Sequence, residues 1–219
     1  ETPLLVGAGG HFCPVARSLG AKLGASEAAV TAKEIEFEMD AQQLAACPVR
    51  ADTPELYFCR DLNGYGWCLR KGNYLNIGLG RAGHEGLAEQ LRDFFDFLRQ
   101  RGRIPGNIPE RFHGHAYLLR GISRRTLLAD GVLLIGDAAG LAYPQSGEGI
   151  RPAVESGLIA AAIVAAAGGD YCEQRLQAYR ERLNARFGTD ASPGADRVPG
   201  FLRKRLAQAL MGNRWATRR

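Results

Sequence analysis

The segment from Val132 to Gly149 constrains the fold of this 219-residue chain more than any other part. Its continuous apolar run, Val132 to Ile135, predicts a strand that is buried on both faces. Asp137 follows, where its carboxylate can accept hydrogen bonds from sugar-like hydroxyls, and a glycine-rich loop leads into an expected helix from Gly149. The start of a helix favours negative charge, because free backbone N–H groups and the helix dipole point there. A turn-capping aspartate would explain a lone Gly-Asp pair, but the whole string favours a ligand site.

A second glycine cluster, Gly7 to Gly10, lies near the start of the chain. The dinucleotide fingerprint G-x-G-x-x-G needs a third glycine where the helix packs on the strand, and Phe12 occupies that position. A parallel strand that ends in an acidic residue should follow about 20 residues on. Instead, Lys33 to Asp40 alternates polar and apolar residues, which is typical of an antiparallel strand with one wet face. The opening stretch is therefore not predicted to be a Rossmann dinucleotide site.

The chain between these two segments has the pattern of an antiparallel sheet followed by a helix. Strands are expected at 33–40, 55–60, 65–71 and 74–80, and a turn signal at 71–73 joins the last two. Ile35, Phe37 and Met39 would share one apolar face of the first strand. A helix is expected from about 85 to 101, because apolar residues recur there at helical spacing: Leu87, Leu91, Phe94, Phe95 and Leu98.

Three further helices are expected after the buried strand. The first, from Gly149 to Ala167, consists of small and apolar residues and is expected to be buried, with Ile150, Val154 and Leu158 on one stripe. Two amphipathic helices complete the chain, one at 172–187 and one at 202–210. The segment 188–200 is the expected linker between them.

The composition is ordinary for a globular protein, with 46% hydrophobic and 23% charged residues and a net charge of +5. No apolar run reaches the ~18 residues that a membrane span requires. The five cysteines are odd in number and include no C-x-x-C pair, which favours reduced thiols and a cytoplasmic protein. His113 and His115 stand two apart, but no third ligand has suitable spacing, so no metal site is expected.

Basic residues gather near the C-terminus, at 203–205, 214 and 218–219. They favour an anionic substrate or peripheral membrane contact through a basic C-terminal helix, while a solvated basic helix face is the simpler alternative. The sequence has no nucleic-acid-binding motif and no interleaving of aromatic and basic residues. A nucleic-acid partner is therefore not expected.

The sequence from Gly136 to Gly140, GDAAG, followed by PQSGEGI from Pro144 to Ile150, resembles the last FAD fingerprint of flavoproteins with the p-hydroxybenzoate hydroxylase fold. Within that group it is most similar to the geranylgeranyl reductase branch. The resemblance implies that Asp137 binds the ribityl chain of FAD and that the backbone at Gly149 and Ile150 faces the pyrimidine edge of the flavin. The same expected cofactor site includes Ala138 and Gly147.

The opening glycine cluster belongs to a segment, Gly7 to Arg17, that resembles the middle fingerprint of the same family, G-A-D-G-x-x-S-x-V-R. This resemblance implies that Gly10 and Arg17 contact FAD. The segment departs from the family's pattern at Gly9 and Cys13, which replace the acidic residue and the serine.

The segment Tyr65-Gly-Trp67 resembles the Y-x-W-x-F-P motif in the strand that lines the substrate cavity of geranylgeranyl reductases. Leu69 and Arg70 stand where the family has Phe and Pro. Tyr65, Trp67 and Leu69 share one strand face. They could line an apolar substrate pocket with a polar rim, or they could simply belong to the core of the sheet.

The resemblance implies an α+β / α/β protein with the FAD-binding p-hydroxybenzoate hydroxylase fold, lacking its N-terminal Rossmann unit. Four parts are expected: a remnant of the FAD-binding domain with the middle fingerprint at 1–24, an antiparallel-sheet substrate domain at 25–112, the FAD-binding domain with the Gly-Asp fingerprint and its helix at 113–168, and C-terminal helices at 169–219. Since the sequence contains no true G-x-G-x-x-G segment, we expect the C-terminal part of a flavoprotein, which holds FAD poorly on its own.

The expected function is that of an FAD-dependent oxidoreductase. It would transfer hydride from reduced flavin to a carbon–carbon double bond of an isoprenoid-like or other apolar substrate. A flavin-dependent monooxygenase (hydroxylase) of the same fold is one alternative, and it is favoured over a halogenase because the W-x-W-x-I-P motif is missing. A truncated non-catalytic module of a flavoprotein is the other alternative. We expect this chain alone to be inactive.

Overall fold

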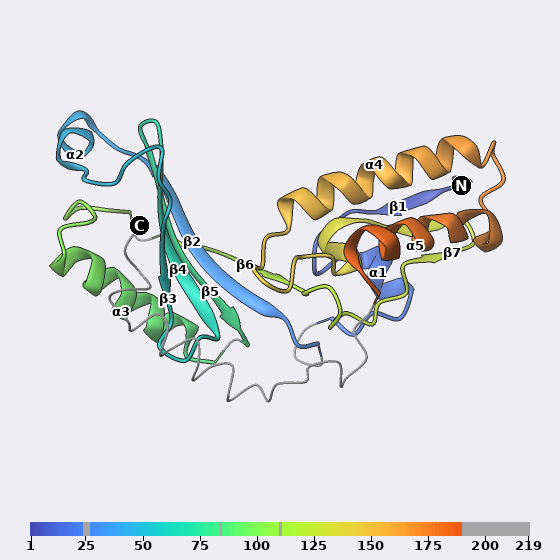
Figure 1. Ribbon diagram of the computed structural model, residues 1–219, viewed down its shortest axis with the longest axis horizontal. Helices are drawn as coiled ribbons and strands as arrows, with labels where there is room; N and C mark the ends of the chain where they lie inside the picture. The colour runs from blue at the N-terminus through green and yellow to red at the C-terminus, as the bar shows by residue number, and fades with distance from the viewer. Residues whose placement is uncertain (24–26, 84, 110, 190–219) are drawn as a thin grey trace.

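The computed structural model describes residues 1–23, 27–83, 85–109 and 111–189, and these residues form two β-sheets. The five-stranded sheet contains β2 (Val30–Glu38), β3 (Glu55–Phe58), β4 (Gly64–Lys71), β5 (Tyr74–Ala82) and β6 (His113–Tyr117), in the order β3-β4-β5-β2-β6. The three-stranded sheet contains β1 (Leu5–Gly7), β7 (Leu128–Ala129) and β8 (Val132–Leu134), in the order β1-β8-β7. We call the parts built on them the sheet lobe and the fingerprint lobe (Figure 1).

The sheet lobe is antiparallel throughout, and one face of its sheet packs on α3 (Leu87–Gln100). Alternate strand residues such as Ile35 and Ile77 are buried against Phe94 and Leu98 of this helix. β4 approaches α3 closely at Gly66, where a Cβ atom would lie only 2.6 Å from the Phe94 ring. The other face of the sheet is turned toward the fingerprint lobe (Figure 1).

The fingerprint lobe combines the parallel pair β1 and β8 with four helical segments. These are α1 (Pro14–Ser18), the 3-10 turn η1 (Gly136–Ala139), α4 (Ile150–Ala166) and α5 (Glu173–Phe187). Leu133 and Leu134 of β8 are fully buried, together with Leu176 and Tyr179 of α5. The Tyr179 hydroxyl donates a hydrogen bond of 2.7 Å to the Leu134 carbonyl. The prediction of a buried strand at 132–135 is therefore confirmed.

The expected antiparallel strands and the helices at 85–101 and 172–187 are confirmed, with boundaries shifted by a few residues. The short helix α2 (Ala41–Ala46) was not expected. β6 begins at 113, the expected start of an FAD-binding part, and it pairs with β2 of the sheet lobe. The division into 1–24, 25–112, 113–168 and 169–219 stays a prediction. The expected helix at 202–210, the basic C-terminal residues and most of the expected linker lie outside the described residues.

The predicted helix at 149–167 is confirmed as α4, but the expectation that this helix is buried is wrong for one of its faces, the stripe of Ile150, Val154 and Leu158. Ile150, Val154 and Leu158 are 81%, 59% and 67% exposed. The buried face consists instead of mostly small residues, among them Ser156 and Ala160. The reason is close packing between α4 and the turn at Gly136. The Gly136 N–H donates a hydrogen bond to Ser156 Oγ at 3.0 Å, and a larger side chain at position 156 would push α4 away from this turn.

Within the described ranges, no helix is both long and apolar enough to cross a membrane. All five cysteines are free thiols. Among the same described residues, no group of three or more histidine, cysteine, aspartate and glutamate side chains is placed to hold a metal ion.

Candidate functional site

The turn after β8 presents Asp137 to the start of α4. Gly149 is the N-cap residue of this helix, and a Cβ atom there would lie 3.0 Å from Asp137 Oδ1. Glycine therefore allows the carboxylate to lie directly against the helix N-terminus. The structure brings together two residues, Asp137 and Gly149, that were predicted to contact the cofactor.

The Asp137 carboxylate is half-buried, and no residue in the described parts of the chain donates a hydrogen bond to it. Burial raises the pKa of this carboxyl, and the side chains of His115, His11 and Arg125 oppose the shift. An ionised carboxylate offers only acceptors. Asp137 is thus suited to receive hydrogen bonds from the hydroxyls of a ligand.

The loop between η1 and α4 folds back on itself and contacts the sheet lobe. The Tyr143 N–H donates to the Glu148 carbonyl at 2.9 Å, and the Gly147 N–H donates to the Tyr143 carbonyl at 2.8 Å. The Tyr65 hydroxyl on β4 donates to the Ser146 carbonyl at 2.7 Å. The loop that contains the predicted cofactor residue Gly147 is therefore held against β4.

A cavity of about 280 Å³ lies where this loop meets the sheet lobe. Its lining includes Tyr65 and Tyr117 from the sheet, and Pro144 and Gly147 from the loop. Residues of both lobes would contact a ligand in this cavity at the same time.

Two other predicted cofactor residues lie at the ends of the same segment. Ala138 is fully buried in η1, where its carbonyl accepts a hydrogen bond from Arg125 at 3.0 Å. Ile150 is exposed in the first turn of α4. Glu148, directly before the N-cap residue, accepts a hydrogen bond from the Arg151 N–H at 2.7 Å and so satisfies a free N–H group of the first turn of α4.

The middle-fingerprint residues lie in the loop after β1 and in α1. The Gly10 carbonyl accepts a hydrogen bond from the Cys13 N–H at 3.1 Å, and α1 begins directly after Cys13. Arg17 is exposed on α1. Arg125 connects this loop to the turn that carries Asp137. It contacts His11, the residue after Gly10, and it also contacts the backbone of η1.

Tyr65, Trp67 and Leu69 lie on the face of β4 that points away from α3, since Gly66 and Cys68 between them face the helix. The structure therefore does not place the three side chains in the core of the sheet lobe. The Tyr65 and Trp67 rings are 6.0 Å apart. Of the three, only Tyr65 lines the cavity described above, whereas Trp67 donates to Asn76 Oδ1 at 2.6 Å. All three stay candidates for substrate contact.

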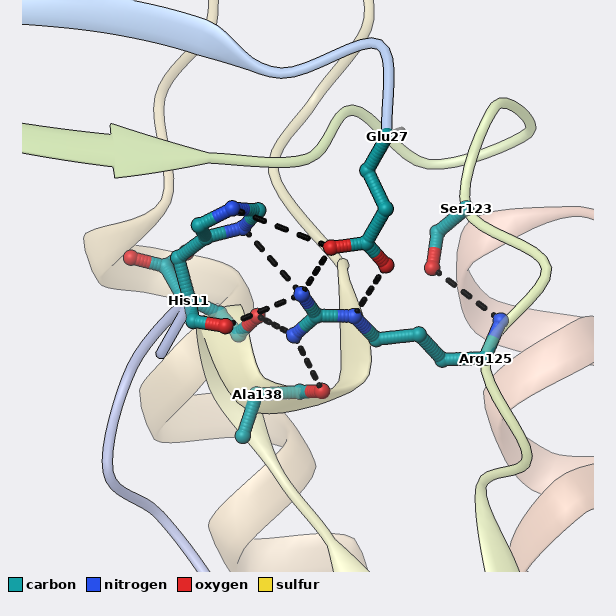
Figure 2. Close-up of polar contacts among 6 residues, drawn as sticks. His11, Glu27, Ser123, Arg125 and Ala138 are labelled. Atoms are coloured by element: carbon teal, nitrogen blue, oxygen red, sulfur yellow. Dashed lines mark hydrogen bonds and ion pairs between the residues drawn. The ribbon is translucent and has the colours of Figure 1, made fainter. Parts of the chain in front are cut away.

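A buried ion-pair cluster of His11, Glu27 and Arg125 lies beside this site (Figure 2). The sequence did not predict it, because the three residues are far apart in the chain and only His11 lies within a fingerprint segment.

Comparison with known proteins shows what this chain is similar to. No protein-family model matches the chain. A digeranylgeranylglycerophospholipid reductase of Methanosphaera stadtmanae is 31% identical over 128 residues, which cover 57% of this chain and 32% of that protein. The structure of a geranylgeranyl bacteriochlorophyll reductase-like protein from Thermoplasma acidophilum aligns with a TM-score of 0.68 and 22% identity, over 96% of this chain and 51% of that chain. Over just over half of its length, the chain is similar in sequence to digeranylgeranylglycerophospholipid reductases.

The chain spans about a third of the length of the curated protein that it matches. Its fold is part of the p-hydroxybenzoate hydroxylase fold, as predicted. PqsL, a probable FAD-dependent monooxygenase from Pseudomonas aeruginosa, has the same fold, with a TM-score of 0.53 and 19% identity over 84% of this chain and 51% of that chain. At that identity the likeness to PqsL concerns the fold alone.

Proposed function

We propose that this chain provides part of the flavin site and the substrate-facing sheet of an FAD-dependent reductase. The reaction is the reduction of carbon–carbon double bonds in an isoprenoid-like or other apolar substrate. The observation that carries the proposal is the half-buried Asp137 carboxylate, which lacks a donor in the described protein and lies against the N-terminus of α4. The sequence similarity to a digeranylgeranylglycerophospholipid reductase, which is named for an isoprenoid lipid, supports the substrate class.

The residues of the site fit FAD. Asp137 would accept hydrogen bonds from ribityl hydroxyls, and the start of α4 at Gly149 and Ile150 would favour the electron-rich pyrimidine edge of the ring. Gly147 and Ala138 belong to the segments that would surround the ring. Gly10 and Arg17 would contact FAD from the middle-fingerprint segment.

FAD, when bound, supplies the hydride, while the protein binds, orients and keeps water out. Tyr65 would orient the site directly, because its hydroxyl binds the loop before α4 to β4 and its side chain lines the cavity. Trp67 and Leu69 extend the same strand face beyond the cavity and would contact an apolar substrate.

The proposal is tested with the full-length gene product that includes this chain. After purification with FAD, the flavin is reduced without oxygen and mixed with a polyprenyl lipid, and mass spectrometry measures the gain of two hydrogen atoms per double bond. Flavin reoxidation coupled to that gain is the expected result. Reoxidation only in the presence of oxygen, with an oxygen atom in the product, would instead support the monooxygenase alternative that the fold of PqsL allows.

Peripheral membrane contact is part of the same proposal, because the substrate class is lipid-like. It rests on the basic residues at 203–205, 214 and 218–219, which lie outside the described residues. Binding to anionic vesicles that weakens as salt rises is the expected behaviour.

Replacing Trp67 with alanine is expected to reduce kcat/KM about tenfold for a long polyprenyl substrate and much less for a short soluble one. A long chain covers more of the surface that Trp67 provides, and loss of about 50–60 Å² of apolar contact costs about 1.4 kcal/mol. Steady-state kinetics with both substrates, at equal flavin content, measure the difference.

The matched control is Trp67→Phe, which keeps most of the apolar ring but loses the hydrogen bond to Asn76. It should retain the preference for the long chain. Equal losses for both substrates in Trp67→Ala, or turnover of small polar aromatics only, would contradict an apolar-chain site on this face.

A further inference from the structure

Arg125 is a deeply buried charge, with a side chain that is only 1% exposed. It lies between β6 and β7, outside every fingerprint. Its Nε and Nη2 atoms donate to the two carboxylate oxygens of Glu27 at 2.9 and 2.6 Å. The pair is therefore bidentate, which is the strong form of this interaction.

The remaining donors of the same guanidinium bind two other segments (Figure 2). Nη2 donates to the His11 carbonyl at 2.9 Å and lies 3.2 Å from His11 Nδ1. Nη1 donates to the carbonyls of Ala138 and Asp137, at 3.0 and 3.4 Å. One side chain thus joins the loop after β1, the turn after β8 and the segment that leads into β2.

The contact with His11 bears on the state of the imidazole. Arginine has no acceptor, so the 3.2 Å approach of Nη2 to Nδ1 fits an unprotonated Nδ1. Burial and the neighbouring Arg125 both lower the pKa of His11, in agreement with a neutral ring. The cluster therefore contains one cation, Arg125, and one anion, Glu27, near the Asp137 carboxylate.

A buried ion pair contributes little to the net stability of a fold, because the desolvation of the two charges offsets their attraction. The position of this one suggests a different role. Arg125 binds the backbone of Asp137 and Ala138 directly, and its charge lies where it helps to keep a half-buried carboxylate ionised. Lysine could keep the charge, but it cannot bridge Glu27 and the carbonyls with one planar fork.

We propose that Arg125 is a positioning residue of the flavin site: it fixes the turn that carries Asp137 against the loop that carries His11. The proposal rests on the proposed function, since it assumes that Asp137 is the flavin ligand. Arg125 itself does not touch the cofactor in this assignment, and it acts through the orientation of Asp137.

The test measures the dissociation constant of FAD in the full-length gene product, for Arg125→Lys in two backgrounds. In the wild-type background, we expect FAD affinity to fall about tenfold. In an Asp137→Asn background, the same substitution should change the affinity less than about threefold, because the group on which Arg125 acts is gone. A residue that only stabilises the fold would weaken FAD binding equally in both backgrounds.

Two further variants keep the test decisive. Arg125→Met with Glu27→Gln removes both charges, which avoids an unpaired buried glutamate if Arg125→Lys folds poorly. Arg103→Lys is the matched control, because Arg103 also binds a glutamate, Glu55, through two nitrogens, but on the sheet lobe. It should leave FAD affinity unchanged.

The outcomes separate the two proposals. If Asp137→Asn alone does not weaken FAD binding, the assignment of Asp137 as the flavin ligand fails. If Asp137→Asn weakens binding but Arg125→Lys does not, or if the two effects are additive, the positioning role is wrong. Failure of Arg125→Lys and the double variant to fold would assign Arg125 to the fold alone and would also overturn the proposal.

Discussion

Asparagine in place of Asp137 is expected to weaken FAD binding by about ten- to a hundredfold while it makes the flavin-free protein more stable. The first effect follows from the loss of charge-assisted hydrogen bonds to ribityl hydroxyls, worth ~1.5–3 kcal/mol. The second follows from burial, which raises the pKa of Asp137 in the folded state above its ordinary value. The same residue would thus favour function and oppose stability.

The sign of the pH dependence supports the second effect. A carboxyl with a raised pKa binds its proton more tightly in the folded than in the unfolded protein. Its contribution to stability is greatest in acid, and it falls as the pH rises from the ordinary carboxyl pKa through the raised one. At neutral pH the ionised Asp137 therefore costs stability, and the neutral asparagine removes this cost.

Isothermal titration with FAD and chemical unfolding of the flavin-free protein measure the two effects in parallel. Asp170→Asn is the matched control in the same lobe, because Asp170 is exposed and accepts a hydrogen bond from the Cys172 N–H at 3.2 Å. That contact lowers the pKa of Asp170, so the control should not gain stability. Unchanged FAD affinity in Asp137→Asn would show that the flavin assignment is wrong.

Truncation of Leu134 to alanine is expected to lower the free energy of unfolding of this 219-residue chain by ~2–5 kcal/mol. Leu134 is 0% exposed in β8, where a Cβ atom at Gly7 of β1 would already lie 2.5 Å from its side chain. The neighbouring parallel strand and α5 cannot fully close the cavity that the substitution leaves.

Leu158→Ala on α4 is the matched control, because it removes the same atoms from a side chain that is 67% exposed. It should change the free energy of unfolding by no more than about 0.5 kcal/mol. Denaturant unfolding of both variants gives the comparison. Equal costs for the two leucines would mean that α4 buries the stripe of Ile150, Val154 and Leu158 after all.

The sheet lobe could be predicted from the sequence because its elements have one buried and one open face. Alternation through Ile35 and Phe37 identifies the inner face of β2, and the spacing from Leu87 to Leu98 identifies the inner face of α3. In such elements the hydrophobic pattern alone defines the packing.

The helix α4 shows where this approach fails. It has apolar residues on more than one face, so the pattern does not say which face is buried. The choice depends on the fit of small side chains against the Gly136 turn, which is a property of the assembled structure. A rule that selects the largest apolar residues selects the wrong face here.

The candidate site could be predicted only where its residues lie close together in the sequence. Asp137 and Gly149 belong to one local segment, and their spacing is visible in the sequence. The contact of Tyr65 with Ser146 and the partners of Arg125 join segments that are distant in the chain. No local pattern specifies such pairs, so they emerge only from the tertiary structure.

The pairing of β1 with β8 has a consequence for the order of folding. Leu5 lies opposite Val132, so more than half of the chain separates the two strands, whereas β4 and β5 meet at a tight turn between Lys71 and Tyr74. Closing a long loop costs entropy before any contact repays it, and parallel pairing across such a distance is slow. The hairpin of the sheet lobe should therefore acquire protection from hydrogen exchange first. The parallel pair, and with it the turn that carries Asp137, should form last.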